Sequence, residues 1–184
     1  DHPTVSVLWN TTDTFPVPKD KAAPQKVAMR YSATGSPYSR DMALIMRYWA
    51  HTKALVMSIT INLAKSQGEL RLRSKDIHDQ PFLDYKYLQD PLDRQRMREG
   101  IRLSASLFRR EEMKNIAADP LDPNEITMDS DQALDYWMMT RVSTSHHISC
   151  TCKMGLESDV TSVVNQYGQV HGLRGLRIAD ASIF

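Results

Sequence analysis

The sequence contains no run of 18 apolar residues, so no segment is long and apolar enough to span a bilayer as a helix. It also lacks an excess of either charge, because 23 Lys and Arg face 22 Asp and Glu and the net charge is +1. Such a balance gives no strong field for nucleic acid or an anionic membrane. Only two cysteines occur, too few for a disulfide framework, which favours a reducing, cytoplasmic location. We therefore expect neither a membrane span nor a nucleic-acid partner.

The two ends of the chain do not read as natural termini. The first residue is Asp rather than Met, and "DHPTVSVLWN" has no signal-peptide layout. The last residues, "RIADASIF", are apolar and predict a strand that enters a core, whereas a natural C-terminus is more often polar and frayed. We therefore expect a piece of a longer protein, although 184 residues are enough for one domain with its own core.

Strand patterns occur along most of the chain. "TVSVLW" (4–9) alternates apolar and polar residues, and residues 56–63 are rich in β-branched side chains. The turn residues "KSQG" join that second run to "ELRLRS" (69–74), so we expect a hairpin. Further strand candidates are residues 81–88 and two or three short strands within 162–183, broken by Gly168, Gly172 and Gly175.

Helical patterns lie between these strands. Residues 38–52 are apolar at Met42, Ile45, Met46 and Trp49, which predicts a short helix. The clearest helix is 90–113, where Asp90 can cap the N-terminus, Pro91 suits the first turn and Gly100 suggests close packing. Residues 129–142 predict another helix, and residues 10–26 and 118–125 predict loops. The pattern indicates an α+β fold, a mainly antiparallel sheet flanked by helices.

Both cysteines and two of the six histidines fall within "HHISCTCKMG" (146–155). In an extended backbone His146, Cys150 and Cys152 share one face and could begin a zinc site, but a fourth ligand is not evident and the cysteine spacing is unusually short. A disulfide between those cysteines would need the backbone to turn, because two residues of strand span about 6.6 Å. A third interpretation is that His147, whose residue type titrates near neutrality, accepts a proton.

The residues after this cluster extend the pattern. "HISCTCKMG" followed by "VVNQYGQVHGLRGLRIADASIF" resembles the C-terminal signature of the glucose-methanol-choline (GMC) oxidoreductases. Those flavoenzymes carry a histidine, then Gly-Thr, a variable residue, Arg or Lys, and Met-Gly, followed by a "VHG..GLRV.DAS" ending. More loosely, residues 68–88 are similar to the strand-loop-strand of the family, and "DHP" at the start to its "LQDHP" segment. The ordered matches are His147, Thr151, Met154, Gly155, Val163, Val164, Val170, His171, Gly172, Gly175, Leu176, Arg177, Asp180, Ala181 and Ser182.

The resemblance implies an FAD-dependent oxidation of a small-molecule alcohol. Hydride would pass from the carbinol carbon to flavin N5, and His147 would accept the hydroxyl proton. The backbone around His146 would lie against the isoalloxazine, and Asp180 and Ala181 would lie near the FAD pyrophosphate or ribityl chain. Residues 1–155 would form the substrate-binding domain. Residues 156–184 would form strands returning to an FAD-binding domain, an upstream segment of the same protein that this chain does not contain.

Two positions of this chain differ from the family pattern, and a third, His171, matches it. Cys150 stands where the family has a glycine, which allows close backbone approach or a positive φ, so cysteine would reshape the pocket. Asn165 stands where the family usually has Asp, a turn role that either residue fills. His171 reads as mainly structural. The second catalytic residue of the family lies beyond Phe184.

Two alternatives to alcohol oxidation stay open at this point. One is a lyase or another flavin reaction on the GMC fold, since a fold does not fix its chemistry. The other is a non-catalytic module with a metal bound by His146, Cys150 and Cys152. No G-x-G-x-x-G follows a predicted strand, so dinucleotide binding is not encoded in these 184 residues.

Overall fold

The computed structural model describes residues 3–11, 26–27, 42–49 and 54–184. Two compact units can be distinguished. The sheet unit comprises Pro3–Gln67 and Lys86–Ser143, and the extension unit comprises Gly68–Tyr85 and Thr144–Phe184. The predicted loop at 10–26 falls almost entirely outside the described residues, apart from its first two residues and its last, which lie in strands.

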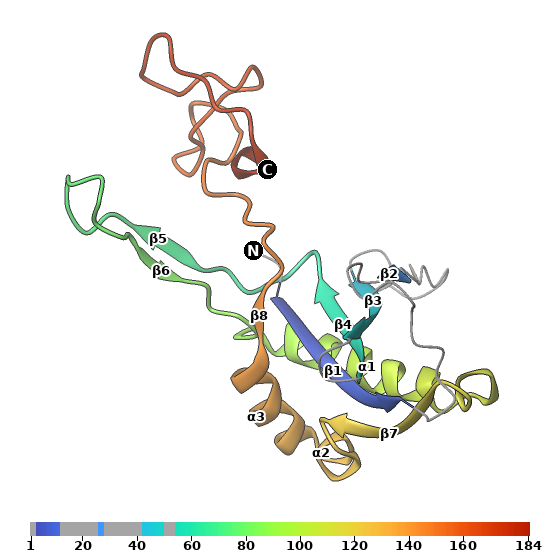
Figure 1. The fold of residues 1–184 in the computed structure, drawn as a ribbon. Helices are drawn as coiled ribbons and strands as arrows, with labels where there is room; N and C mark the ends of the chain where they lie inside the picture. The colour runs from blue at the N-terminus through green and yellow to red at the C-terminus, as the bar shows by residue number, and fades with distance from the viewer. Residues whose placement is uncertain (1–2, 12–25, 28–41, 50–53) are drawn as a thin grey trace. The chain divides into compact units, whose positions relative to one another are not determined.

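The sheet unit is built on an antiparallel sheet in the order β2-β3-β4-β1-β7 (Figure 1). β8 also pairs with β1, where the chain leaves the unit. This confirms the predicted α+β class and its antiparallel sheet. The strands are β1 (Pro3–Thr11), β2 (Lys26–Val27), β3 (Met42–Trp49), β4 (Ala54–Ile61), β7 (Ala117–Asp122) and β8 (Ser143–Thr144).

The two faces of this sheet differ in chemistry, because successive side chains of a strand point to opposite faces. The face that forms the core carries Val5, Val7, Leu44, Met46, Leu55, Met57, Ile59 and Ile61. The other face carries two hydroxyl pairs between β1 and β4. Thr4 Oγ1 lies 2.8 Å from Thr60 Oγ1, and Ser6 Oγ lies 3.2 Å from Ser58 Oγ.

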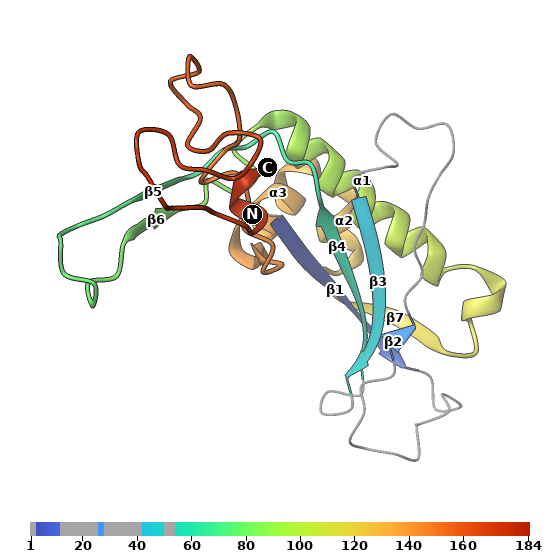
Figure 2. The same cartoon turned by 90° about the horizontal axis from the view of Figure 1, so that it is seen from above.

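Helix α1 (Pro91–Phe108) lies across the apolar face (Figure 2). The carboxylate of Asp90 accepts a hydrogen bond from the backbone N–H of Leu92 at 2.8 Å, and Pro91 opens the helix, as predicted. Close packing at Gly100 is also confirmed. A Cβ there would lie 2.6 Å from Met42 Cε and 2.8 Å from Ile59 Cγ2. The apolar side chains that α1 buries are Met97, Ile101, Ala105 and Phe108. The helix ends five residues earlier than predicted, and a 3₁₀ turn (Glu111–Met113) follows.

Two short helices complete the sheet unit. These are α2 (Glu125–Asp129) and α3 (Asp131–Arg141), and Ser130 caps α3 by accepting a hydrogen bond from Ala133 N at 3.2 Å. The predicted helix at 129–142 is thereby confirmed. Trp137 packs into the core, and its indole N–H donates to Asp122 Oδ1 at 2.6 Å.

The helix predicted at 38–52 is wrong over its described residues, 42–49, which form β3; its remaining residues lie outside the described part of the chain. Met42, Leu44 and Met46 alternate toward the core, and β3 lies between β2 and β4. A central strand with apolar residues on both faces can show the same spacing of apolar residues as a helix. Here β3 forms a strand because it pairs with β2 and β4. The loop predicted at 118–125 is also wrong, because residues 117–122 form β7 alongside β1.

The predicted hairpin between residues 56–63 and 69–74 is wrong as well. β4 is buried along its whole length, and both of its edges are taken by β1 and β3. β5 (Glu69–Arg71) instead pairs with β6 (Phe82–Asp84) in a separate two-stranded sheet. A run as apolar as β4 belongs in the middle of a sheet, where local turn signals do not choose its partner.

Apart from the β5–β6 pair, the described residues of the extension unit contain little regular structure. The strands predicted within 162–183 reduce to isolated bridges, Val164 with Met154 and Val170, and Gln169 with Arg177. Val164 is the only buried apolar side chain in the described part of this unit. The predicted C-terminal strand is wrong at its end, because Ala181–Ile183 forms a 3₁₀ turn. Of the helices in the described residues of both units, none is long and apolar enough to cross a bilayer.

Candidate functional site

The backbone of the histidine-cysteine segment, residues 146–155, is hydrogen-bonded to the C-terminal turn, Ala181–Ile183. Three backbone N–H groups of the segment donate to carbonyl oxygens of that turn. Cys150 N donates to Ala181 O at 3.4 Å, and Cys152 N donates to Ser182 O at 2.8 Å. Met154 N donates to Ile183 O at 2.9 Å. The structure therefore joins the stretch that follows His147 to the Asp180–Ala181 stretch, which the sequence had linked only through a resemblance.

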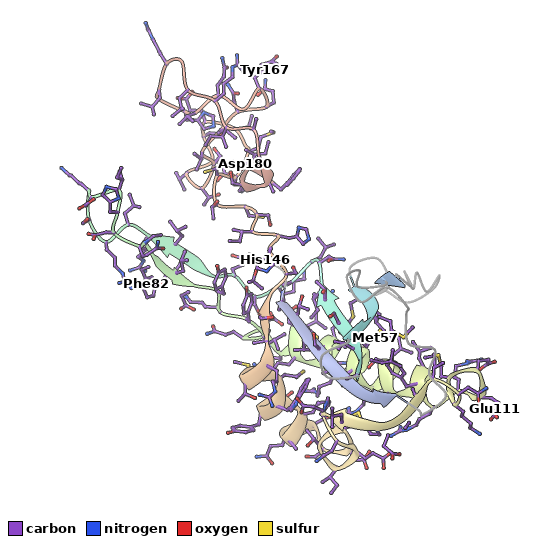
Figure 3. The ribbon with its side chains drawn as sticks, viewed as in Figure 1. Met57, Phe82, Glu111, His146, Tyr167 and Asp180 are labelled. Atoms are coloured by element: carbon purple, nitrogen blue, oxygen red, sulfur yellow. The ribbon has the colours of Figure 1, made fainter. Side chains whose placement is uncertain are left out.

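His147 lies within residues 146–150, called the turn below, where the backbone bends at His146. The two end residues of the turn, His146 and Cys150, have positive φ angles of 65° and 70°. His146 N donates to Thr144 Oγ1 at 2.8 Å, which anchors the start of the turn. The side chain of His147 is exposed. Figure 3 shows His146 and Asp180, both in the extension unit.

Cys150 adopts the conformation that the sequence placed in doubt. Its φ of 70° is the left-handed conformation that glycine reaches most easily, so cysteine has kept that geometry in this chain. Cys150 is exposed and Cys152 half-buried, and both thiols are free. Among the described residues, no group of three His, Cys, Asp or Glu side chains is placed to hold a metal ion. The metal site from His146, Cys150 and Cys152 therefore finds no support.

Asp180 organises the C-terminal turn. Its Oδ1 accepts a hydrogen bond from Ser182 N at 2.8 Å. Hydrogen bonds from the side chain and backbone of Ser182 lower the pKa of the Asp180 carboxyl from its ordinary value of 3.8. Asp180 is therefore an ionised, acceptor-only group at neutral pH. Ala181, the other predicted cofactor contact in this turn, is exposed.

The neighbouring loops have structural partners. The ring Nε2 of His171 lies 3.2 Å from Gly155 O, which agrees with its predicted structural role. Asn165 has the predicted turn role, because its side-chain oxygen accepts from Tyr167 N at 2.9 Å and Gln169 N at 3.1 Å. An open cavity of about 420 Å³ adjoins these loops and is lined by Glu157, Asn165 and residues 169–177. None of the predicted catalytic or cofactor-binding residues lines it.

Sequence reasoning missed two features near the site. Lys153 Nζ lies 2.8 Å from Asp159 Oδ2, and this hydrogen bond, with others from Thr161, lowers the pKa of Asp159 far below its ordinary value. No local pattern indicated that pair. The cap at the C-terminal turn was visible in principle, because an Asp side chain commonly accepts a hydrogen bond from the backbone N–H two residues further on. It was hidden by the apolar residues around it.

A protein-family model described as GMC oxidoreductase matches residues 64–184. An oxygen-dependent choline dehydrogenase of Photobacterium profundum is 35% identical over 124 residues, covering 67% of this chain and 22% of that protein. One of Paraburkholderia xenovorans is 39% identical over 119 residues, covering 64% of this chain and 20% of that protein. The matched region is thus about a fifth of these curated relatives.

Solved structures show the same fold. Pyridoxine 4-oxidase from Mesorbium loti superposes with a TM-score of 0.82 at 24% identity, covering 100% of this chain and 37% of that one. A fungal aryl-alcohol oxidase superposes with a TM-score of 0.64 at 27% identity, covering 76% of this chain and 23% of that one. Both the sheet unit and the extension unit are therefore covered by a known architecture.

Proposed function

The chain belongs to the GMC oxidoreductase family, and on that premise we propose that it is the substrate-binding portion of a flavoenzyme that oxidises an alcohol. One observation carries the proposal: an exposed His147 lies in a turn fixed on both sides by hydrogen bonds. A general base must be accessible to its substrate and must be held in place while it acts. The similar choline dehydrogenases and aryl-alcohol oxidase support an alcohol as the substrate class.

The residues beside His147 fit a bound flavin. Ser145 Oγ is buried and has no hydrogen-bond partner within the described part of the chain. A buried hydroxyl without a partner indicates that a further group completes the site. Asp180, as an ionised acceptor, suits the hydroxyl groups of a ribityl chain better than an anionic pyrophosphate, which it would repel. We therefore assign His146, Asp180 and Ala181 to the FAD side of the site.

His147 supplies the acid-base part of the reaction. Bound FAD would supply the acceptor for the hydride that leaves the carbinol carbon, at flavin N5. A neutral imidazole can accept the hydroxyl proton of the alcohol. Proton transfer by a positioned side chain contributes typically 10²–10⁴-fold to the rate. His147 would hold the proton until it returns to solvent.

A further part of the same polypeptide would cover residues 144–184 of the extension unit. Among the described residues of this unit Val164 is the only buried apolar side chain, whereas Ile148, Leu156, Val160 and Phe184 are exposed. Removing such apolar side chains from water is favourable. We propose that the FAD-binding segment covers them, with residues 1–155 binding substrate and residues 156–184 returning toward the flavin.

The experiment uses the complete protein that contains this chain. A flavin absorbance band in the purified protein is expected, and its absence would remove the oxidoreductase proposal. Anaerobic stopped-flow mixing with choline and with benzyl alcohol then measures flavin reduction. His147→Ala is expected to slow reduction about 10²–10⁴-fold at saturating substrate, because the proton acceptor is lost.

His78→Ala is the matched control, because His78 is an exposed histidine on the loop between β5 and β6. Its reduction rate should equal that of the unaltered protein. A lyase or another flavin reaction on the same fold would instead give product without net flavin reduction. If His147→Ala reduces its flavin as fast as His78→Ala, His147 is not the proton acceptor.

A further inference from the structure

We propose that the left-handed backbone conformations of His146 and Cys150 form a positioning device for His147. The inference rests on the proposed function, because it concerns how the proposed proton acceptor is held. His146 has a φ of 65° and Cys150 a φ of 70°. Only residues 147–149 lie between them. The backbone therefore changes direction immediately before His147 and again shortly after it.

These two conformations are unusual for their residue types. In the left-handed region the Cβ of an L-residue approaches the following carbonyl oxygen, so residues other than Gly are uncommon there, although Asn, Asp and His enter it more often than the rest. Histidine and cysteine therefore stay there because their surroundings hold them. Backbone outliers of this kind cluster at functional sites, where the strain is part of the arrangement.

The surroundings that hold them are hydrogen bonds on each side of the turn. Before it, Thr144 Oγ1 accepts from His146 N at 2.8 Å. After it, Cys150 N and Cys152 N donate to Ala181 O and Ser182 O at 3.4 Å and 2.8 Å. These anchors fix where the turn begins and ends, and the two left-handed residues fix the direction in which the chain leaves each anchor. The imidazole of His147 is thereby aimed by its backbone.

The thiol of Cys150 lies 3.5 Å from Ser149 Oγ, to which it donates, but the proposed role needs only the backbone conformation of Cys150. What matters at position 150 is the positive φ, which glycine adopts without the steric contact of a Cβ. Cys150→Gly should therefore preserve the direction of His147. Cys150→Val should not, because a β-branched residue is a severe outlier at positive φ. Cys150→Ala lies between them and is useful if the valine variant folds poorly.

The first measurement does not depend on activity. Carbethoxylation of histidines by diethyl pyrocarbonate in the complete protein is followed by mass spectrometry of peptides. His171, whose ring nitrogen lies 3.2 Å from Gly155 O, serves as the internal reference for local folding. The rate at His147 should change several-fold in Cys150→Val and stay unchanged in Cys150→Gly, with the His171 rate constant in both.

The second measurement is the split between kcat and KM for alcohol oxidation. Cys150→Val should lower kcat about tenfold with little change in KM, since the cost of positive φ reduces the population with His147 correctly aimed. Cys150→Gly should keep the kcat of the unaltered protein. If the kcat of Cys150→Gly is as low as that of Cys150→Val, the thiol itself is needed and the proposal is wrong. Equal His147 reactivity in all three variants also overturns it.

The two proposals fail in different ways. If His147→Ala oxidises alcohol at the rate of the unaltered protein, the proposed function fails for that residue. The carbethoxylation rates still show whether position 150 controls the exposure and orientation of the imidazole. If instead His147→Ala is inactive and the Cys150 variants all behave alike, only the positioning proposal is lost.

Discussion

Replacement of Asp93 by alanine should destabilise the sheet unit more than any replacement of a surface carboxylate. Asp93 is completely buried in the first turn of α1. Its carboxylate accepts from Lys65 N at 3.0 and 2.9 Å, from Ser66 N at 2.7 Å and from Ser66 Oγ at 2.8 Å. Arg96, 2% exposed, donates to it at 3.3 Å. Asp93 thus holds the segment that follows β4 against the start of α1.

The size of the effect follows from what the alanine leaves behind. The guanidinium of Arg96 would stay buried without its carboxylate, and two backbone N–H groups would lose their acceptor. Breaking a buried ion pair by removing one partner costs about 3–5 kcal/mol. Since a domain of this kind is stable by about 5–15 kcal/mol, the loss would be a large fraction of the total. The melting temperature should fall by about 2–4 °C for each kcal/mol.

Urea denaturation followed by circular dichroism measures the free energy of unfolding. Asp135→Ala is the matched control, because Asp135 also faces an arginine but is 31% exposed, and its loss should cost at most about 1 kcal/mol. The double variant Asp93→Ala, Arg96→Met should be more stable than the sum of the single losses predicts, by about 0.5–3 kcal/mol. A loss below about 1 kcal/mol for Asp93→Ala, or additive effects in the double variant, would refute the reasoning.

Three other replacements test the packing, a cap and an ion pair. Gly100→Ala gains about 1 kcal/mol of helix propensity but places a Cβ 2.8 Å from Ile59 Cγ2, an overpacking cost of about 1–3 kcal/mol, so urea denaturation should show no net gain. Ser130→Ala should cost about 1 kcal/mol by the same assay, with Ser130→Asp restoring it, because either side chain caps α3. Asp159→Asn should make the melting temperature fall less as the pH is lowered. The hydrogen bond from Lys153 lowers the pKa of Asp159, so the stabilisation from the ionised carboxylate is complete above the ordinary pKa of 3.8 and is lost as the pH falls below that value. A difference between Asp159→Asn and the unaltered chain that persists unchanged at low pH would contradict this cause.

Local chemistry in the sequence was enough to place the main helices. Asp90, Pro91 and Ser130 act through atoms within three residues of themselves, so their effects are written in the adjacent sequence. The alternation at 4–9 predicted β1 for the same reason. Gly100 gave a correct signal of close packing, although its partners on β3 and β4 were not identifiable.

Strand pairing was beyond the sequence. Residues 42–49 satisfy a helical spacing and a two-sided strand spacing equally well, and only pairing with β2 and β4 selects the strand. β5 is the next strand after β4 along the chain, yet β4 already has β1 and β3 at its edges. The partner of an edge depends on segments distant in the chain, and no turn signal specifies them.

The candidate site was likewise predictable from the sequence only in part. The order of residues in "HHISCTCKMG" and "RIADASIF" determined the family, and the choice of His147, Asp180 and Ala181 came from that order alone. The tertiary structure decided that the two stretches join through backbone hydrogen bonds and that Cys150 keeps a left-handed φ. Residue types record which chemistry is available. Backbone direction depends on hydrogen bonds between segments distant in the chain, such as Cys152 and Ser182, and these form only when the chain folds.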